Sequence, residues 1–422
     1  MTELLITGAR LIGGDAGDLL IRDGVFVDPA SAGSDVERID ADGLIALPGL
    51  VDTHCHLREP GREDAETIES GTRAAARGGY TAVLAMANVN PVTDTAEAVE
   101  HMKALAAETA SAAVHPVGAV TKGLAGEELA ELGLMARAGV RLFSDDGKCV
   151  HDSLVMRRAL EYVRAFDGVI AQHAQDPRLA GAGACCHEGE ISGRLGLGGW
   201  PAVAESVIVA RDVQLAEMTG SRYHVCHVST AESVDVIRWA KARGIKVTAE
   251  VTPHHLLLMT SAVEGYDPTF KVNPPLRPDE HVEALREALA DGTIECVGTD
   301  HAPHAAHDKD HAFSDAAFGM LGLETSLAVV MDTMVAEGRL DWAGVADRMA
   351  YAPARIAGLS NQGRPLEIGE PANLVLVDPE RRREVDRAAS LSKSRNNPYH
   401  GRDLPDPVRL TLWAGRTTFR DL

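Results

Sequence analysis

The central part of the chain alternates between two patterns of hydrophobic positions. Short runs of consecutive apolar residues are followed by longer segments in which apolar residues recur every three or four positions. A short continuous apolar run is typical of a strand buried on both faces, and the longer spacing is typical of an amphipathic helix. The strands expected on this basis are GLVDTHCH, YTAVLAMAN, AAVHPVGAV, VRLFSDDG, GVIAQHAQD, YHVCHVST, IKVTAEVTPHH and TIECVGTDHAPH.

These eight strands are separated mostly by helical segments, for example HDSLVMRRALEYVRAF and VAESVIVARDVQLAEMTG. Eight alternating β and α units predict an α/β fold, a (β/α)8 barrel of the TIM type, with a doubly wound open sheet as the alternative. Each expected strand is apolar at its start and ends in a cluster of polar residues. Active sites of such barrels form at the carboxyl ends of the strands, so we expect these clusters to meet at one mouth.

Both ends of the chain have a different pattern of hydrophobic positions. Residues 1–47 consist of short apolar runs punctuated by glycine and aspartate, and residues 366–422 return to this pattern with ANLVLVD and VRLTLWAGRTTFRD. Such spacing is typical of short strands joined by turns. We therefore expect the ranges 1–47 and 366–422 to pair as one small β domain beside a barrel formed by residues 48–365.

Composition and charge narrow the possible partners. The 422-residue chain is 45% hydrophobic and carries a net charge of −21. Nucleic acids and anionic membranes bind basic surfaces, so neither is an expected partner, whereas a few local cations can still bind a small anion. We see no signal peptide and no apolar run long enough to cross a membrane, so a cytoplasmic location is expected. The six cysteines form no C-x-x-C pair and are expected to be reduced.

Candidate metal ligands stand at the ends of five expected strands. His54 and His56 close the first strand, and they face the same side because strand residues alternate; Arg58 would continue that face. The other candidates follow in chain order: Asp145 and Asp146 at the fourth strand, His173 at the fifth, His227 at the sixth and Asp300 at the eighth. Imidazole nitrogens and carboxylate oxygens suit zinc and related divalent ions. Several such groups at one mouth predict a metal centre.

A series of motifs carries a resemblance to a known family. DTHCHLREPG, MANVNP, FSDDG, AQHAQD, CHVS, EVTPHHLLL, KVNPPLR and GTDHAPH occur in this order, and ANLVLVD closes the series. Together they resemble the dihydroorotases of the amidohydrolase superfamily, and most closely the bacterial type with a bridging aspartate. The resemblance implies a (β/α)8 barrel with a small β-sandwich formed by both chain ends. One departure is Val89 in MANVNP, where the family usually has threonine; Asn88 itself is retained.

The resemblance also implies two zinc ions per chain. The implied ligands are His54, His56 and Asp300 for one ion, His173 and His227 for the second, and Asp146 as a bridge between them. Many relatives carry a carbamylated lysine at the bridging place. The family's spacing to the next histidine selects Asp146, which leaves Asp145 as a turn or supporting residue, and Lys148 fits the lysine position poorly.

The chemistry implied is metal-assisted hydrolysis of a cyclic amide. Two metal ions would lower the pKa of a bridging water from about 15.7 toward about 7 and so provide a hydroxide nucleophile at neutral pH. Asp300 would take the hydroxide's proton as general base and return it to the departing ring nitrogen as general acid. No side-chain nucleophile is expected, because the chain has no G-x-S-x-G elbow, and the glycine-rich RLGLGGW is expected to be a structural loop.

The reaction implied is the reversible cyclisation of N-carbamoyl-L-aspartate to L-dihydroorotate, a step of pyrimidine biosynthesis. Such an anionic substrate needs a cation and hydrogen-bond donors, and arginine can bind a carboxylate through two parallel hydrogen bonds. Arg58, Asn88 and His304 match the family positions for this task, and Asn273 matches a residue that binds the ring. The stretch 302–320 is expected to act as a lid that excludes water.

Two other functions stay open at this stage. A hydantoinase or dihydropyrimidinase would act on neutral rings, but such relatives normally carry the bridging lysine and do not need a carboxylate-binding site. A member without metal ligands would serve only as a structural partner of aspartate transcarbamoylase, but all six expected ligands are present. An active enzyme could also form that complex, and a homo-oligomer is the expected assembly.

Overall fold

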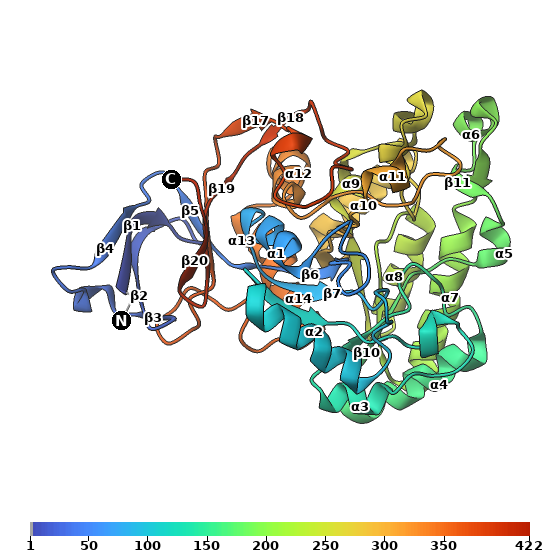
Figure 1. Ribbon diagram of the computed structural model, residues 1–422, viewed down its shortest axis with the longest axis horizontal. Helices are drawn as coiled ribbons and strands as arrows, with labels where there is room; N and C mark the ends of the chain where they lie inside the picture. Colours follow the sequence, from blue (N-terminus) through green and yellow to red (C-terminus); the bar gives the residue numbers. More distant parts are fainter. Residues whose placement is uncertain (1–2) are drawn as a thin grey trace.

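The computed structural model describes residues 3–422, and its centre is a barrel of eight parallel strands (Figure 1). The strands are, in barrel order, β6 (Leu50–Cys55), β7 (Tyr80–Ala85), β8 (Ala113–Pro116), β9 (Leu142–Phe143), β10 (Val169–Gln172), β13 (Arg222–Val225), β14 (Val247–Val251) and β15 (Cys296–Val297). They form two sheets, which isolated bridges join between Gly118 and Phe143 and between Cys55 and His301. All eight expected strands are present, and the predicted (β/α)8 barrel is confirmed.

Burial on both faces explains why these strands read as continuous apolar runs. Every residue of β6 and β7 is buried, including the polar Asp52 and Thr53. The Oγ1 of Thr53 donates a hydrogen bond to Glu250 on β14 (2.5 Å), and the Oγ1 of Thr299 donates to Asp52 (2.6 Å). Buried polar groups need such partners, so these bonds make a polar first strand compatible with a barrel interior.

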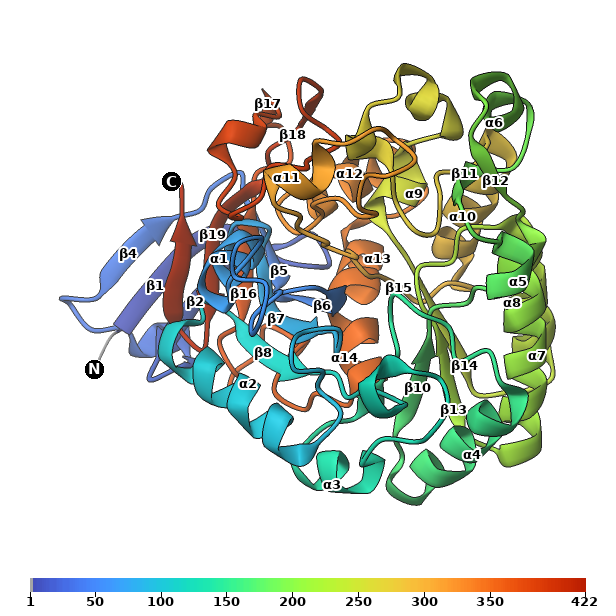
Figure 2. The same cartoon turned by 45° about the vertical axis from the view of Figure 1, so that its right-hand side comes forward.

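Helices cover the outside of the barrel (Figure 2). They are α1 (Ile68–Arg77), α2 (Ala96–Thr109), α3 (Leu132–Arg137), α4 (Ser153–Val163), α7 (Val203–Thr219), α8 (Ala231–Ala242), α10 (Asp279–Asp291), α12 (Ser326–Val330), α13 (Trp342–Ala346) and α14 (Ala352–Ala357). Helix α1 shows how the sequence starts such a helix. The Oγ1 of Thr67 accepts a hydrogen bond from the backbone N–H of Ser70 (3.1 Å), which caps the N-terminus, and Ile68 begins the buried face.

Three long connections follow the carboxyl ends of the strands. The first contains α5 (Pro177–Ala180), β11 (Ala184–His187), α6 (Glu190–Leu195) and β12 (Gly198–Trp200); the second contains α9 (Pro253–Leu257); the third, residues 302–320 and called the β15 loop below, contains α11 (Ala306–Lys309). The buried side chains of Cys185, Cys186, Val263 and Phe313 form one apolar cluster that joins all three. The RLGLGGW stretch is part of the first connection, as expected of a structural loop.

Strands from both ends of the chain form one mixed sheet beside the barrel (Figure 1). Its order is β20 (Arg416–Arg420), β19 (Val408–Trp413), β16 (Leu374–Val377), β5 (Ile45–Pro48), β1 (Glu3–Arg10), β2 (Ala16–Arg22) and β3 (Val25–Val27), with β4 (Glu37–Asp40) paired to β1. Its core includes Ile6, Phe26, Leu374 and Leu410, from both ends of the sequence. The expected pairing of the two ends is therefore present.

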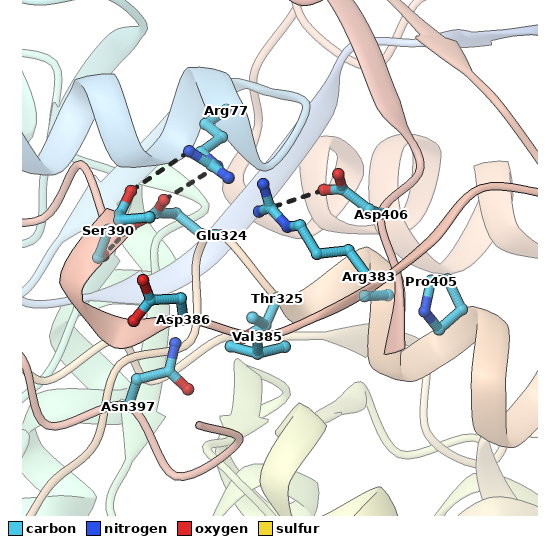
Figure 3. A pocket seen from close by; sticks show the side chains of 12 residues that line it. Arg77, Glu324, Thr325, Arg383, Val385, Asp386, Ser390, Asn397, Pro405 and Asp406 are labelled. Atoms are coloured by element: carbon cyan, nitrogen blue, oxygen red, sulfur yellow. Dashed lines mark hydrogen bonds and ion pairs between the residues drawn. The ribbon is translucent and has the colours of Figure 1, made fainter. Parts of the chain in front are cut away.

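One part of the C-terminal range leaves this sheet and returns to the barrel. It lies between β17 (Arg382–Glu384) and β18 (Asp403–Pro405), which pair with each other. A small cavity of about 30 Å³ marks the junction (Figure 3). Its arginines already face carboxylates, Arg77 at 3.2 Å from Glu324 and Arg383 at 3.4 Å from Asp406, so this junction is internally compensated in charge.

Across residues 3–422 we find no helix with the length and hydropathy that crossing a membrane requires.

Candidate active site

The six predicted metal ligands meet at one end of the barrel. They lie at or just after the carboxyl ends of their strands: His54 and His56 at β6, Asp146 after β9, His173 after β10, His227 after β13 and Asp300 after β15. All six residues are buried, with none more than 5% exposed. The structure therefore brings together residues that are up to 246 positions apart in the sequence because parallel strands end at the same mouth.

Asp146 lies at the centre of this group. Its Oδ1 is 3.2 Å from Nε2 of His54, 3.3 Å from Nε2 of His227 and 3.5 Å from Nδ1 of His173, and its Oδ2 is 3.3 Å from Nε2 of His56. Burial would raise the pKa of Asp146, but the surrounding histidines lower it well below its usual value. The carboxylate is therefore ionised and faces all four imidazoles.

The neighbouring Asp145 has a different position. Its carboxylate accepts hydrogen bonds from the backbone N–H groups of Val120 (2.8 Å) and Thr121 (3.0 Å), so it fixes the chain that follows β8. Lys148, the other alternative, has an exposed side chain. Of these three residues, Asp146 is the one that faces the histidines.

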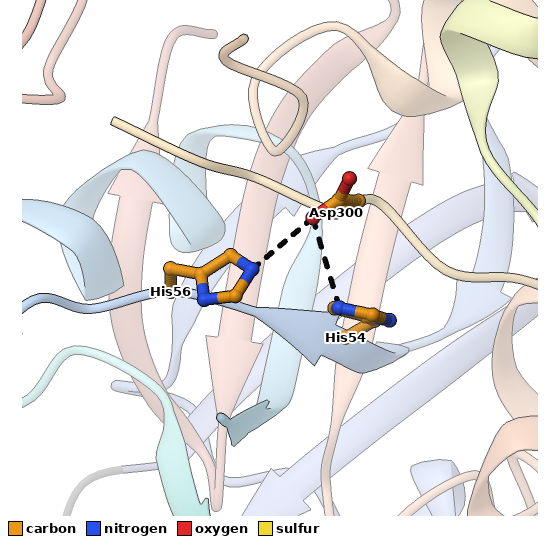
Figure 4. A group of neighbouring side chains, drawn as sticks. All are labelled: His54, His56 and Asp300. Atoms are coloured by element: carbon orange, nitrogen blue, oxygen red, sulfur yellow. Dashed lines mark hydrogen bonds and ion pairs between the residues drawn. The ribbon is translucent and has the colours of Figure 1, made fainter. Parts of the chain in front are cut away.

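Asp300 faces the two histidines of the first strand (Figure 4). Its Oδ1 lies 3.1 Å from Nε2 of His56 and 3.6 Å from Nε2 of His54. Burial alone would raise the pKa of Asp300, but the hydrogen bond to His56 and the neighbouring imidazoles lower it to about 2. Asp300 is therefore ionised at neutral pH and able to accept a proton.

Three of the histidines are oriented by an oxygen at their second ring nitrogen. The contacts are His54 Nδ1 to Glu250 Oε1 (2.6 Å), His56 Nδ1 to Asn88 Oδ1 (2.8 Å) and His173 Nε2 to Gln175 Oε1 (2.8 Å). A carboxylate or amide oxygen only accepts hydrogen bonds, so each of these ring nitrogens donates. The other nitrogen of each ring lies within 3.5 Å of Asp146 and would direct its lone pair at a metal ion bound there.

This donor set fits a metal ion. The Nε2 of His54 is fully buried and makes no aligned hydrogen bond, although it lies 3.2 Å from a carboxylate oxygen. Lone pairs and carboxylate oxygens that face one another repel unless a positive charge lies between them. Burial works against a charged imidazole, yet Asp146 and Glu250 raise the pKa of His54 well above its usual value, so the group attracts positive charge. Two sets of donors, His54 with His56 and Asp300, and His54 with Asp146 and His227, are close enough to share an ion.

Backbone strain also concentrates at this site. Arg58, His227 and Asp300 have positive φ angles of 60°, 31° and 45°. Left-handed backbone is uncommon for residues other than glycine, and it persists where the surrounding structure imposes it. These three side chains are therefore aimed by the fold rather than by local preference.

Glu250 is a functional residue that the sequence reasoning missed. Besides His54, it contacts Thr53 Oγ1 and lies 3.2 Å from Nε2 of His224, and it is only 1% exposed. Burial would raise the pKa of Glu250, but the two histidines lower it well below its usual value. The available signal was a glutamate near the end of the expected strand IKVTAEV, where a charged residue that is buried needs a partner.

Asp52 was missed for a similar reason. Its carboxylate accepts hydrogen bonds from the backbone N–H of Thr299 (2.8 Å) and from its hydroxyl, which joins β6 to the chain that precedes Asp300. Burial raises the pKa of Asp52 to about 7. The signal was its position two residues before His54, on the same face of the strand.

A cavity of about 240 Å³ opens beside the metal-ligand candidates, and all four residues predicted to bind substrate line it: Arg58, Asn88, Asn273 and His304. The Nε of Arg58 donates to the carbonyl of Pro303 (3.0 Å), and its Nη2 lies 3.4 Å from Nε2 of His304. Burial and the charge of Arg58 lower the pKa of His304 to about 3, so this imidazole is neutral. The guanidinium provides the positive charge on this side of the cavity.

The two asparagines differ in the groups that they leave free. Asn88 is engaged at both ends, because its Oδ1 accepts from His56 and its Nδ2 donates to the backbone carbonyl of Asp146 (3.3 Å). Asn273 donates through Nδ2 to Gln175 (3.1 Å), but its buried Oδ1 has no partner among the described residues. The cavity therefore contains one unused acceptor at Asn273.

Solved structures share this architecture. L-hydantoinase (dihydropyrimidinase) from Arthrobacter aurescens matches with a TM-score of 0.89 and 26% identity, covering 100% of this chain and 96% of that chain. Dihydropyrimidinase from Brevibacillus agri matches with a TM-score of 0.87 and 23% identity, covering 99% and 95% of the two chains. The fold and the buried histidine–aspartate group together define a cyclic amidohydrolase.

Sequence comparisons then identify the family within that class. The dihydroorotase of Streptomyces coelicolor is 59% identical over 426 residues, covering 100% of this chain and 99% of that protein. The dihydroorotase of Mycobacterium tuberculosis is 54% identical over 425 residues, covering 99% of each. A family model described as dihydro-orotase-like matches residues 43–233. The chain belongs to the dihydroorotase family, which confirms the resemblance carried by the motifs.

Proposed function

We propose that the chain catalyses the reversible ring closure of N-carbamoyl-L-aspartate to L-dihydroorotate and uses two zinc ions. The observation that carries this proposal is the pairing of two features in one cavity. The metal-ligand candidates His56 and Asp300 line the cavity together with Arg58, whose Nη2 lies 3.4 Å from Nε2 of His304. This combination suits a cyclic amide that bears a carboxylate.

The ligand set follows from the contacts around Asp146. His54, His56 and Asp300 would hold one zinc ion, His173 and His227 the other, and Asp146 both, since its two oxygens face histidines of both groups. When bound, the metal ions supply a Lewis acid for the amide carbonyl and a water with a pKa lowered toward about 7. Glu250, Asn88 and Gln175 keep the three histidines in the required orientation.

Asp300 moves the proton in this reaction. Its carboxylate is ionised, and only Oδ1 faces the histidines, while the other oxygen points away from both (Figure 4). In ring opening, Asp300 takes a proton from the attacking water and gives it to the ring nitrogen as the C–N bond breaks. Ring closure runs the same transfers in reverse.

The remaining cavity residues select the substrate. Arg58 would bind the carboxylate through its guanidinium, with Asn88 and His304 beside it. The free Oδ1 of Asn273 would accept a hydrogen bond from a ring N–H. A neutral ring such as hydantoin leaves Arg58 without its partner, which disfavours the hydantoinase alternative.

The β15 loop is proposed to act as a lid. Ala302, His304 and Gly319 of this loop line the cavity. Its middle is held by Lys309, whose Nζ donates to the carbonyls of Pro268 (3.0 Å) and Ala317 (2.7 Å). Movement of this loop would open or close the cavity to water.

We further propose that the chain is organised as a barrel unit, 48–365, and a small β unit, 1–47 with 366–422, and that it is a cytoplasmic homo-oligomer. Association with aspartate transcarbamoylase is proposed as an additional property of the active enzyme. Size-exclusion chromatography of the purified chain, alone and mixed with the transcarbamoylase, tests the homo-oligomer and the association. A monomer in the first run or separate elution in the second would contradict them.

The first experiment is ring opening of L-dihydroorotate by the purified protein, followed as loss of ultraviolet absorbance, with zinc per chain measured on the same sample. We expect turnover that a chelator abolishes and added zinc restores. A folded, zinc-loaded protein that ignores dihydroorotate but opens hydantoin or dihydrouracil would move the function to the neutral-ring relatives. A folded protein without metal and without turnover would favour a structural role.

A further inference from the structure

A short C-terminal segment holds the β15 loop in place. We call residues 390–397 the C-terminal clasp, and its key residue is Asn396, which is 5% exposed. The Nδ2 of Asn396 donates to the backbone carbonyls of Ala302 (2.9 Å) and Gly319 (3.2 Å), and its Oδ1 accepts from the backbone N–H of His304 (3.2 Å). Its own carbonyl accepts from the N–H of Leu321 (3.1 Å). One side chain therefore ties both ends of the β15 loop together.

The clasp is itself anchored to the loop that carries Arg58. Glu66, at the end of that loop, is fully buried and accepts hydrogen bonds from the Ser392 hydroxyl and from the N–H of Lys393 (2.9 Å). The hydroxyl of Ser394 donates to the carbonyl of Ala65 (2.6 Å). The clasp thus joins the loop after β6 to the loop after β15.

A second carboxylate fixes the start of the clasp. Glu324, which lines the small cavity of Figure 3, accepts hydrogen bonds from the Ser390 hydroxyl and from the N–H of Leu391 (3.0 Å). Glu324 and the buried Glu66 thus hold residues 390–393, and the Ser394 hydroxyl holds the chain two residues before Asn396. The amide is therefore presented to the β15 loop in one orientation.

We propose that Asn396 is a positioning residue for the substrate carboxylate. This inference rests on the proposed function, because Arg58 and His304 are taken as the groups that bind the carboxylate. Arg58 lies on the loop after β6 and His304 lies on the β15 loop, and the clasp is hydrogen-bonded to both loops. Asn396 sets the position of the His304 backbone, and with it the distance between the imidazole and the guanidinium that the carboxylate must match.

An asparagine meets this task because its amide has donors at one end and an acceptor at the other. In Asn396→Asp, an oxygen would replace Nδ2 and face the carbonyl oxygens of Ala302 and Gly319 at the distances given above. Two oxygens without a proton between them repel, so the β15 loop would be displaced. Asn396→Ala removes the same bonds without adding repulsion, and it serves as the milder variant if Asn396→Asp fails to fold.

Asn397 provides a matched control in the same segment. It is also 5% exposed, and its Oδ1 accepts from the N–H of Tyr399 (2.9 Å), a role that an aspartate retains. Its side chain lines the small cavity of Figure 3. Asn397→Asp therefore adds the same buried charge one residue away while keeping its acceptor.

The test combines kinetics with binding of an analogue that is not turned over. For Asn396→Asp, and to a smaller extent Asn396→Ala, we expect KM for dihydroorotate and Kd for orotate to rise about tenfold or more, because a misplacement near 1 Å is sufficient for such losses. The zinc content and the fold should stay as in the wild type, and kcat should change less than KM. Asn397→Asp should keep both constants within about twofold, well below the loss expected for a misplaced group.

Three results would overturn the inference. Unchanged KM and orotate affinity in a folded Asn396 variant would show that the amide does not position the carboxylate site. Loss of zinc with unchanged orotate affinity would place its effect at the metal centre instead. If Asn397→Asp caused the same losses, a general disturbance of the clasp would explain both. A wild-type protein that does not open dihydroorotate would instead remove the proposed function, and the inference with it.

Discussion

Replacing Glu250 by glutamine tests whether the carboxylate behind His54 controls metal binding. In the wild type, the two oxygens of Glu250 face Nδ1 of His54 at 2.6 Å, Thr53 Oγ1 at 2.5 Å and Nε2 of His224 at 3.2 Å. A glutamine keeps one oxygen and turns the other into an NH2 group. Whichever way the amide lies, a donor then faces either His54 or the pair Thr53 and His224.

The expected cost can be worked from these contacts. If the NH2 faces His54, the imidazole must place its lone pair on Nδ1 and its proton on Nε2, which removes the lone pair directed at Asp146. Removing a hydrogen-bond partner that orients a metal-binding histidine typically lowers metal affinity 10–100-fold, or by about 1.4–2.8 kcal/mol. Because Glu250 is 1% exposed and water does not replace the lost bond, we expect the upper end of this range.

The assay is metal affinity, measured by competition with a chromogenic chelator, together with turnover at saturating zinc. Glu205→Gln is the control, since that buried carboxylate accepts bonds from the N–H and hydroxyl groups of Ser229 and Thr230 and none from a proposed ligand. It should lower stability without changing metal affinity. A Glu250→Gln protein that binds zinc within about threefold of the wild type would refute the reasoning, because that is well below the range expected.

Three further predictions follow from the same geometry. Arg58→Lys keeps the charge but loses the two-pronged contact, so KM for dihydroorotate should rise about 10–100-fold with a smaller change in kcat, and an unchanged KM would contradict the carboxylate assignment. Asp146→Asn should lose zinc, measured by metal analysis, whereas Asp145→Asn should retain zinc and lose about 1–3 kcal/mol of stability, measured by denaturant unfolding. Burial lowers the pKa of Lys309 in the folded protein to about 7, whereas in the unfolded chain it is about 10.4. Between these two pH values the unfolded state binds more protons than the folded state, so the free energy of unfolding rises with pH. Thermal unfolding of the wild type and Lys309→Met should show this rise only in the wild type, and parallel curves would contradict it.

The barrel strands and the six ligand candidates were predictable because each has a local signal. A buried parallel strand is a continuous apolar run, and a polar residue within two positions of its end lies at the barrel mouth, as His173 and His227 do. Asp146 and Asp145 could not be separated by pattern alone, since adjacent carboxylates differ only in which neighbours they reach. The resemblance to a family, and not the spacing itself, selected Asp146.

Residues whose role depends on a distant partner escaped the sequence reasoning. Glu250 is 196 positions from His54, and Asn396 is 92 positions from His304. The clasp reads as a loop within a β-rich range, because serine and asparagine in SLSKSRNNP indicate turns rather than contacts with a barrel. Only the fold shows that this range returns to the active-site loops.

The isolated bridges at the two sheet junctions have a consequence for the lifetime of the protein. The junction between β6 and β15 is spanned by His54 and His56 on one side and Asp300 on the other, and Asp146 follows β9 at the second junction. A ligand that binds only the native state stabilises it in proportion to the logarithm of its concentration over Kd. With the proposed ligand set, zinc supply would therefore lengthen the time that each barrel survives proteolysis, and a chain cut short before Asp300 would lack one ligand of the first ion.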